Sequence, residues 1–114
     1  MNDKILKNIS MEDVLELKEL VSYQDGQIVS RTLVQNGAVS ITLFEFDTGE
    51  EISAHESKGN ALLTILDGSG VITIDEKEYA LAAGHSIVMP AGIPHAVKAA
   101  SPFKMLLMVV FPAR

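Results

Sequence analysis

Two histidines and a serine in this sequence have side chains that can bind a metal or orient a small molecule. His55 and Ser57 lie at the end of the segment Gly-Glu-Glu-Ile-Ser-Ala-His-Glu-Ser, residues 49–57, and His95 ends the segment at residues 84–95. Alternate side chains of an extended strand share one face, so we expect His55 and Ser57 to point the same way. Imidazole nitrogens bind divalent transition metals and also exchange hydrogen bonds with organic molecules. His55, Ser57 and His95 are therefore the candidate ligand-binding residues.

The residues around these side chains resemble the two signature motifs of the cupin family. The first motif keeps its leading histidine, His55, between its outer glycines, Gly49 and Gly68. The second motif has a glycine, a Pro-x-Gly turn and a final histidine, and it matches at Gly84, Pro90, Gly92 and His95. The resemblance extends over about residues 42–111 and points to the small single-domain conserved-barrel proteins, the cupin 2 type. It implies a double-stranded β-helix, also called a jelly roll or cupin barrel.

The resemblance also implies a metal site, but this sequence keeps only half of the family's ligands. Full cupin motifs supply three histidines and a glutamate to a divalent transition metal such as Mn, Fe, Ni, Cu or Zn. Ser57 stands in place of the second histidine, and Ala61 stands in place of the glutamate. A neutral serine hydroxyl is a poor ligand for these metals, and alanine offers none. His55 and His95 are thus candidate metal ligands in an incomplete set, and the sequence establishes no cofactor.

Three further residues carry side chains that could supply an additional ligand. Glu56 and Asn60 each lie one residue out of phase with the inward positions, so strand alternation directs them away from the cavity. His85 follows Gly84 at a turn, and we expect it at the surface. None of the three completes the site.

These observations favour a small cupin-domain protein that binds a small molecule in the barrel mouth, with an eroded metal site. Ala61, Leu63 and Ile65 are in phase with the serine and predict a small apolar wall beside the histidines. The alternative is a divalent-metal-dependent cupin enzyme (a dioxygenase, isomerase or lyase) that uses His55 and His95. A third alternative is an interaction scaffold with a vestigial pocket. No residue is identified as catalytic, and the sequence leaves open whether the protein is an enzyme.

Turn-forming residues recur about every ten residues beyond residue 24 and predict an all-β fold. The segments between these turns predict strands at residues 28–35, 39–46, 51–55, 62–66, 71–74, 78–81, 86–89, 95–99 and 103–111. Before them, Ser10-Met-Glu-Asp resembles a capping box, and Val14, Leu17 and Leu20 recur at helical spacing. This pattern predicts a short amphipathic helix over residues 11–21. We therefore expect an N-terminal extension with a short helix at 1–24 and a cupin β-barrel at 25–114.

The last predicted strand carries apolar residues on both of its faces. Met105, Leu107 and Val109 alternate with side chains that are equally apolar. A strand that is apolar on both faces is usually covered on both. We expect a second subunit to cover the outer face, which makes the protein a homodimer; the alternative is that the helix at 11–21 lies there.

Composition and charge limit the remaining function classes. The formal net charge is −6, from 15 acidic and 9 basic residues, and this opposes binding to nucleic acid. The chain has no cysteine, which excludes disulfides and thiolate metal sites. No signal peptide is predicted at the start, and the longest apolar run, residues 105–111, is too short to span a membrane. We expect a cytoplasmic protein with a small-molecule ligand and no nucleic-acid or membrane partner.

Overall fold

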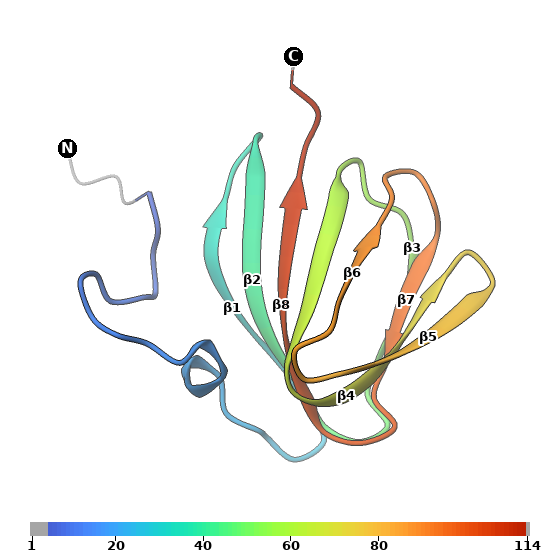
Figure 1. The fold of residues 1–114 in the computed structure, drawn as a ribbon, viewed down its shortest axis with the longest axis horizontal. Coiled ribbons are helices and arrows are strands. Elements are labelled where there is room, and N and C mark those ends of the chain that lie inside the picture. Colours follow the sequence, from blue (N-terminus) through green and yellow to red (C-terminus); the bar gives the residue numbers. More distant parts are fainter. Residues whose placement is uncertain (1–4, 114) are drawn as a thin grey trace.

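Antiparallel strands make up most of the computed structural model, which describes residues 5–113 (Figure 1). A single turn of 3-10 helix, η1 (Leu17–Leu20), precedes them. The strands are β1 (Ile28–Gln35), β2 (Val39–Phe46), β3 (Glu51–His55), β4 (Asn60–Ile74), β5 (Lys77–Ala82), β6 (Ser86–Met89), β7 (His95–Lys98) and β8 (Phe103–Val110). The fold is therefore all-β, as the sequence predicts.

The strands curl into a half-barrel whose two sides share strand β4. One side has the order β1-β2-β8-β4, and β6 pairs with β4 at its far edge. We call this side the β1–β6 sheet after its two edge strands. The other side pairs the second half of β4 with β5 and β7, and β7 with β3. Every one of these pairings is antiparallel. This is the cupin jelly-roll architecture that the resemblance implies.

Strand β4 corrects the prediction of two strands separated by a turn. The strand runs on through residues 67–70 and changes its register against β8 between Ile65 and Asp67. Gly68 has φ +73°, and a Cβ atom there would lie 2.3 Å from the carbonyl oxygen of Pro102. A Cβ atom on Gly70 would lie 3.0 Å from the ring of Phe103. The glycines therefore form a bend that lets β4 cross between the two sides while Phe103 packs closely against it.

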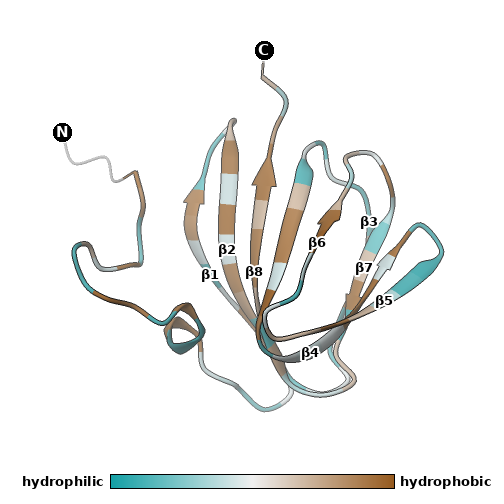
Figure 2. Cartoon of the chain, in the orientation of Figure 1, coloured by the Kyte–Doolittle hydropathy of each residue, from teal (hydrophilic) through white to brown (hydrophobic). Residues whose placement is uncertain are grey.

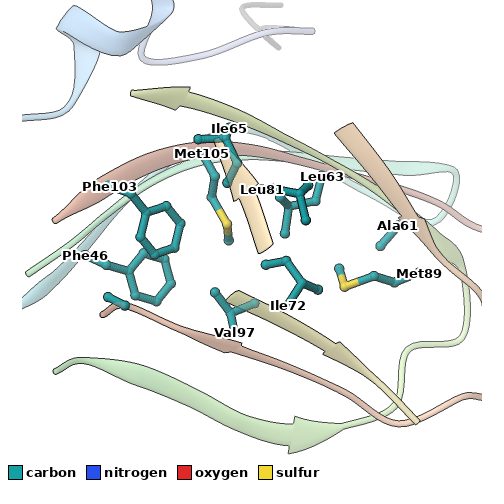
Figure 3. Packing of buried hydrophobic residues seen from close by; sticks show 11 residues of the cluster. Phe46, Ala61, Leu63, Ile65, Ile72, Leu81, Met89, Val97, Phe103 and Met105 are labelled. Atoms are coloured by element: carbon teal, nitrogen blue, oxygen red, sulfur yellow. The ribbon is translucent and has the colours of Figure 1, made fainter. Parts of the chain in front are cut away.

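The inside of the half-barrel is a continuous apolar core (Figure 3). The rings of Phe46 and Phe103 stack at one end, with their centroids 4.6 Å apart. Ala61, Leu63 and Ile65 point inward from β4, as their phase predicts. The remaining members of the cluster are Ile72, Leu81, Met89, Val97, Ala99 and Met105. Because these side chains interdigitate, the predicted apolar wall belongs to a filled core.

The predicted helix over residues 11–21 is wrong in extent, since only η1 forms. Ser10 does not cap it; the residue before η1 is Glu16, which makes no side-chain capping bond. Glu12 has φ +62°, which no helix tolerates, and Val14 is fully exposed instead of packed on a neighbour. A short helix without a cap or a complete buried face is marginal in water. Leu17 and Leu20 do pack onto the outer face of the β1–β6 sheet.

The N-terminal segment covers part of that outer face. Val21, with Leu17 and Leu20, packs against Leu33 and Leu43. Strands β2, β8 and β4 are largely apolar (brown in Figure 2), and part of their outer face lies beyond this cover. Leu62, Val88 and Val110 are exposed there. The intramolecular cover is thus only partial, and the homodimer stays a prediction. None of the helices described is long and apolar enough to cross a membrane.

Candidate functional site

The two histidines meet where two strands pair at the open end of the half-barrel. His55 is the last residue of β3 and His95 is the first residue of β7, and the antiparallel register places them opposite one another. Their ring centroids are 4.4 Å apart, with an angle of 65° between the ring planes. The pair that the two motifs predict therefore comes together in space.

Both rings are oriented by backbone carbonyl groups. Nδ1 of His55 lies 3.0 Å from the carbonyl oxygen of Ser53, and Nδ1 of His95 lies 3.3 Å from that of Ile93. A carbonyl oxygen can only accept, so Nδ1 carries the proton in each of these contacts. In the neutral ring Nε2 then keeps its lone pair. Each imidazole, when neutral, thus presents Nε2 as a hydrogen-bond acceptor.

The environment of the two rings differs. His95 is only 4 % exposed, whereas His55 is open to solvent. Burial lowers the pKa of His95, and the neighbouring His55 lowers it further, although the carbonyl of Ile93 opposes the shift. The lowered pKa favours the neutral form of His95, which is the inner member of the pair.

Ser57 has a different role from the one that strand alternation predicts. Strand β3 ends at His55, so Ser57 lies in the following loop and shares no strand face with the histidine. Its Oγ accepts a hydrogen bond from the amide of Gly59 at 3.1 Å, and its carbonyl accepts one from the amide of Gly92 at 2.9 Å. Ser57 thus ties the β3–β4 loop to the β6–β7 loop beside the histidines.

The other candidate ligands are engaged elsewhere or point away. Oδ1 of Asn60 accepts a hydrogen bond from the amide of Ala91 at 2.9 Å. Nδ1 of His85 accepts one from the amide of Ala82 at 3.0 Å, which makes His85 a turn residue. Glu56 is exposed.

The donor set does not fit a resident metal ion. In the part of the chain that the structure describes, no three His, Cys, Asp or Glu residues lie close enough together to hold one. Ala61 is buried in the core and offers no donor. Two imidazoles alone make a weak chelate, since stable transition-metal sites use three or four protein ligands.

Three hollows of the described surface have linings that include neither histidine. One, of about 250 Å³, is lined by Lys58 of the β3–β4 loop, Asn60 at the start of β4, Ala91 of the β6–β7 loop, and C-terminal residues that include Phe111. Others of about 290 and 300 Å³ lie beside Pro112 and beside Ile5. The histidine pair is therefore separate from these three hollows.

Sequence reasoning missed Ser53 and Ile93, whose carbonyl groups orient the rings. Each lies two residues before its histidine, and that spacing is the only signal the sequence holds. The hollow at Lys58 had no signal, because it forms only where the β3–β4 loop meets the C-terminal segment.

Comparison with known proteins agrees with this architecture. The family model described as the cupin domain matches residues 42–111. A conserved protein of unknown function from Streptococcus pyogenes is 46 % identical and superposes with a TM-score of 0.96 over 100 % of both chains. A cupin superfamily protein from Desulfitobacterium hafniense is 36 % identical, with a TM-score of 0.89 over 94 % of this chain and 98 % of that one.

A curated relative is longer than this chain. The HTH-type transcriptional regulator PuuR of Escherichia coli is 36 % identical over 95 residues, which cover 76 % of this chain and 46 % of the regulator. The chain therefore spans about half the length of the curated relative that it matches. With a family match over most of its strands and relatives of this identity, the chain belongs to the cupin family.

Proposed function

We propose that this cupin binds a small molecule at the rim of the half-barrel, with Nε2 of His55 and Nε2 of His95 as the points of contact. The observation that carries the proposal is the pair itself, two rings 4.4 Å apart with each Nδ1 turned to a backbone carbonyl. Neutral imidazole nitrogens accept hydrogen bonds. The ligand class is therefore a small molecule with hydroxyl or amine donors.

The remaining features of the rim support binding without a metal. Ser57 stabilises the loop beside the pair, and its hydroxyl hydrogen stays available to a ligand. A divalent-metal-dependent dioxygenase, isomerase or lyase would need ligands beyond the two histidines. Ala61 cannot supply one, so this rival is kept as an outcome of the experiment below.

The relationship to a regulator favours binding over catalysis. PuuR is an HTH-type transcriptional regulator, and it shares sequence with this chain over about half of its own length. A domain of a transcriptional regulator can act by binding a ligand, without catalysing a reaction. We propose the same non-catalytic role for the histidine pair here.

We also propose that the protein forms a homodimer through the uncovered part of the outer sheet face. Leu62 pairs with Val88 on one side and with Met108 on the other, and this forms an apolar row. Leu62 and Val88 are exposed. Burial of such a row in a second copy would remove apolar surface from water, at about 25 cal/mol per Å².

Thermal unfolding of chelator-treated protein tests the binding proposal. A panel of small hydroxyl- and amine-bearing molecules is added with and without Mn, Fe, Ni, Cu or Zn. We expect at least one molecule to raise the Tm in the absence of metal, by mass action. His55→Ala and His95→Ala should abolish the rise, while His85→Ala, which changes a histidine outside the pair, should retain it. A rise that appears only with a metal present would favour the enzyme alternative.

A further inference from the structure

A carboxyl group lies buried without a partner on the outer face of the β1–β6 sheet. Glu45 is 0 % exposed, and neither of its side-chain oxygens makes a hydrogen bond. The backbone amides of Gln24 and Val29 lie close enough to lower the pKa of this carboxyl, but burial outweighs them and raises it. Burial of a carboxylate without a partner costs free energy, so this structure favours the protonated form of Glu45.

The nearest cation is directed to a different acceptor. Lys104 pairs with Glu45 across β2 and β8, and it is itself buried. Its Nζ donates a hydrogen bond to the backbone carbonyl of Lys18 at 2.6 Å and lies 4.8 Å from the centre of the Tyr23 ring. No ion pair joins Lys104 to Glu45, both of which are in the described part of the chain.

Several titratable or charged groups surround this carboxyl. The neighbouring β4 contributes Asp67, which accepts a hydrogen bond from the hydroxyl of Tyr23 at 2.6 Å. Asp47, after β2, raises the pKa of Glu45. The groups from the elements packed there are Asp47 just after β2, Arg31 of β1, Lys104 of β8, Asp67 of β4, and Lys18 and Tyr23 of the N-terminal segment. Lys104 is thus the cation that an ionised Glu45 would attract.

These same side chains fasten the N-terminal segment, residues 5–24, which we call the strap. Lys104 holds the carbonyl of Lys18, and Asp67 holds Tyr23. Arg31 donates from Nε to the carbonyl of Asn8 at 2.7 Å and from Nη1 to the carbonyl of Leu20 at 2.8 Å. The strap is therefore held by two cationic side chains of the sheet, Arg31 and Lys104, which donate hydrogen bonds to backbone carbonyls of the strap.

We propose that the strap is a latch that is closed when Glu45 carries a proton and loosens when Glu45 ionises. An ionised Glu45 attracts the ammonium of its cross-strand neighbour Lys104, and Lys104 then leaves the carbonyl of Lys18. Opening admits water to the new carboxylate, which removes the cost of its burial. Because the pKa of Glu45 is raised in the closed state, closure is strongest at low pH and weakens as the pH rises through that raised pKa.

Opening of the latch would change the surface of the protein. The strap covers Leu33, Leu43 and Leu106 on the sheet. Next to them lies the exposed apolar row that contains Leu62. Release of the strap would join the covered and the uncovered residues into one apolar face. The latch is thus a device that sets how much of this face is available, independent of the histidine pair.

Hydrogen–deuterium exchange of the whole protein tests the latch. The amide of Lys7 donates to the carbonyl of Leu33 at 2.8 Å, and the amide of Glu19 donates to the carbonyl of Glu16 at 3.0 Å. Exchange of both amides therefore reports on the strap. We expect their protection factors, corrected for the intrinsic pH dependence of exchange, to fall about threefold to tenfold between about pH 5 and about pH 8. The amide of Leu63 in the core should keep its protection. Constant or rising strap protection would overturn the proposal.

Substitution separates Glu45 from other titrating groups. Glu45→Gln mimics the protonated carboxyl, so its strap should stay protected at both pH values. Glu51→Gln, which changes an exposed carboxyl, should respond as the wild type does. His55→Ala and His95→Ala should also respond as the wild type does, which excludes titration of the histidine pair as the cause. A pH response that persists in Glu45→Gln contradicts the proposal; if that variant does not fold, the wild-type result decides.

Discussion

The barrel mouth and the strap both hold titratable side chains out of water, but they do so in different ways. At the mouth, His95 is buried beside His55, and the backbone carbonyl two residues before each histidine orients its ring. Beneath the strap, Glu45 is buried with no partner, while Lys104 donates to a distant segment. The pairing of two strands that carry motif residues builds the first region, and contacts between the sheet and the N-terminal segment build the second. The first can therefore be recognised from a motif, and the second cannot.

The largest expected effect comes from a change that disturbs both regions at once. Strand β4 pairs with β7, which carries His95, and with β8, which carries Lys104. In Gly68→Ala the new Cβ atom would lie 2.3 Å from the carbonyl oxygen of Pro102, at a positive φ. We expect a loss of about 3 kcal/mol or more in the free energy of unfolding, measured by urea denaturation.

A second glycine provides the matched control. Gly37 has open space around its Cβ position and no positive φ. Gly37→Ala should change the free energy of unfolding by less than about 1 kcal/mol. Equal effects of the two substitutions would show that the bend in β4 does not hold the two regions together.

The next largest effect is expected in the part of the outer face that the strap leaves uncovered. Leu62→Glu places a charge in the exposed apolar row, where a second subunit would bury it. We expect the dissociation constant of the dimer to rise at least about tenfold, which light scattering after gel filtration would detect. Lys77→Glu, on the exposed surface of β5, should leave the molar mass unchanged. A monomeric wild type at all concentrations would rule out the homodimer.

The pH dependence of stability should have opposite signs in the two regions. The pKa of His95 is lowered by folding, so its contribution is complete above the unfolded pKa and is lost as the pH falls through the lowered pKa of the folded state. The pKa of Glu45 is raised, so its contribution is complete at low pH and is lost as the pH rises through the raised pKa. The check is the free energy of unfolding, measured in urea over a pH series. His95→Gln should reduce its decrease at low pH, and Glu45→Gln should reduce its decrease at high pH.

An exposed carboxyl serves as the control for this series. Glu78→Gln should reproduce the wild-type profile, because Glu78 is exposed on β5. If His95→Gln and Glu45→Gln altered the same side of the profile, the contrast between the two regions would be lost.

The smallest effect is expected at Ser57. Ser57→Ala removes the acceptor for the amide of Gly59 and should cost about 0.5–1.5 kcal/mol of stability. Ligand affinity should fall less than it does in His55→Ala, because the serine supports the loop. Ser53→Ala is the control, since it keeps the carbonyl that orients His55. Complete loss of binding in Ser57→Ala would instead make the serine a principal contact.

The fold could be predicted where local patterns agree with tertiary packing. The predicted strands at 28–35, 39–46 and 51–55 match β1, β2 and β3. Residues 67–70 have the composition of a turn, but they continue β4, because the small glycines let Phe103 pack against the strand. The helix at 11–21 failed because its apolar spacing did not reveal that Val14 would face solvent.

The candidate site was predictable to the same degree. The motifs predict that His55 and His95 come together, and the strand register brings them opposite one another. The position of Ser57 depended on where β3 ends, which alternation alone does not give. Glu45 alternates with phenylalanines like any surface residue of a half-buried strand. The backbone of Gln24, which is more than twenty residues away in the chain, lies beside it, and no local pattern carries that information.

The most direct test of the central claim is the protonation of the two imidazoles in metal-free protein. Multiple-bond proton–nitrogen NMR spectra distinguish a protonated Nδ1 from a protonated Nε2. We predict the Nδ1–H form for His55 and His95, and a shift of both Nε2 signals when a molecule selected by thermal unfolding is added. An Nε2–H form in either ring, or a shift of the signals only after a divalent metal is added, would contradict the proposal.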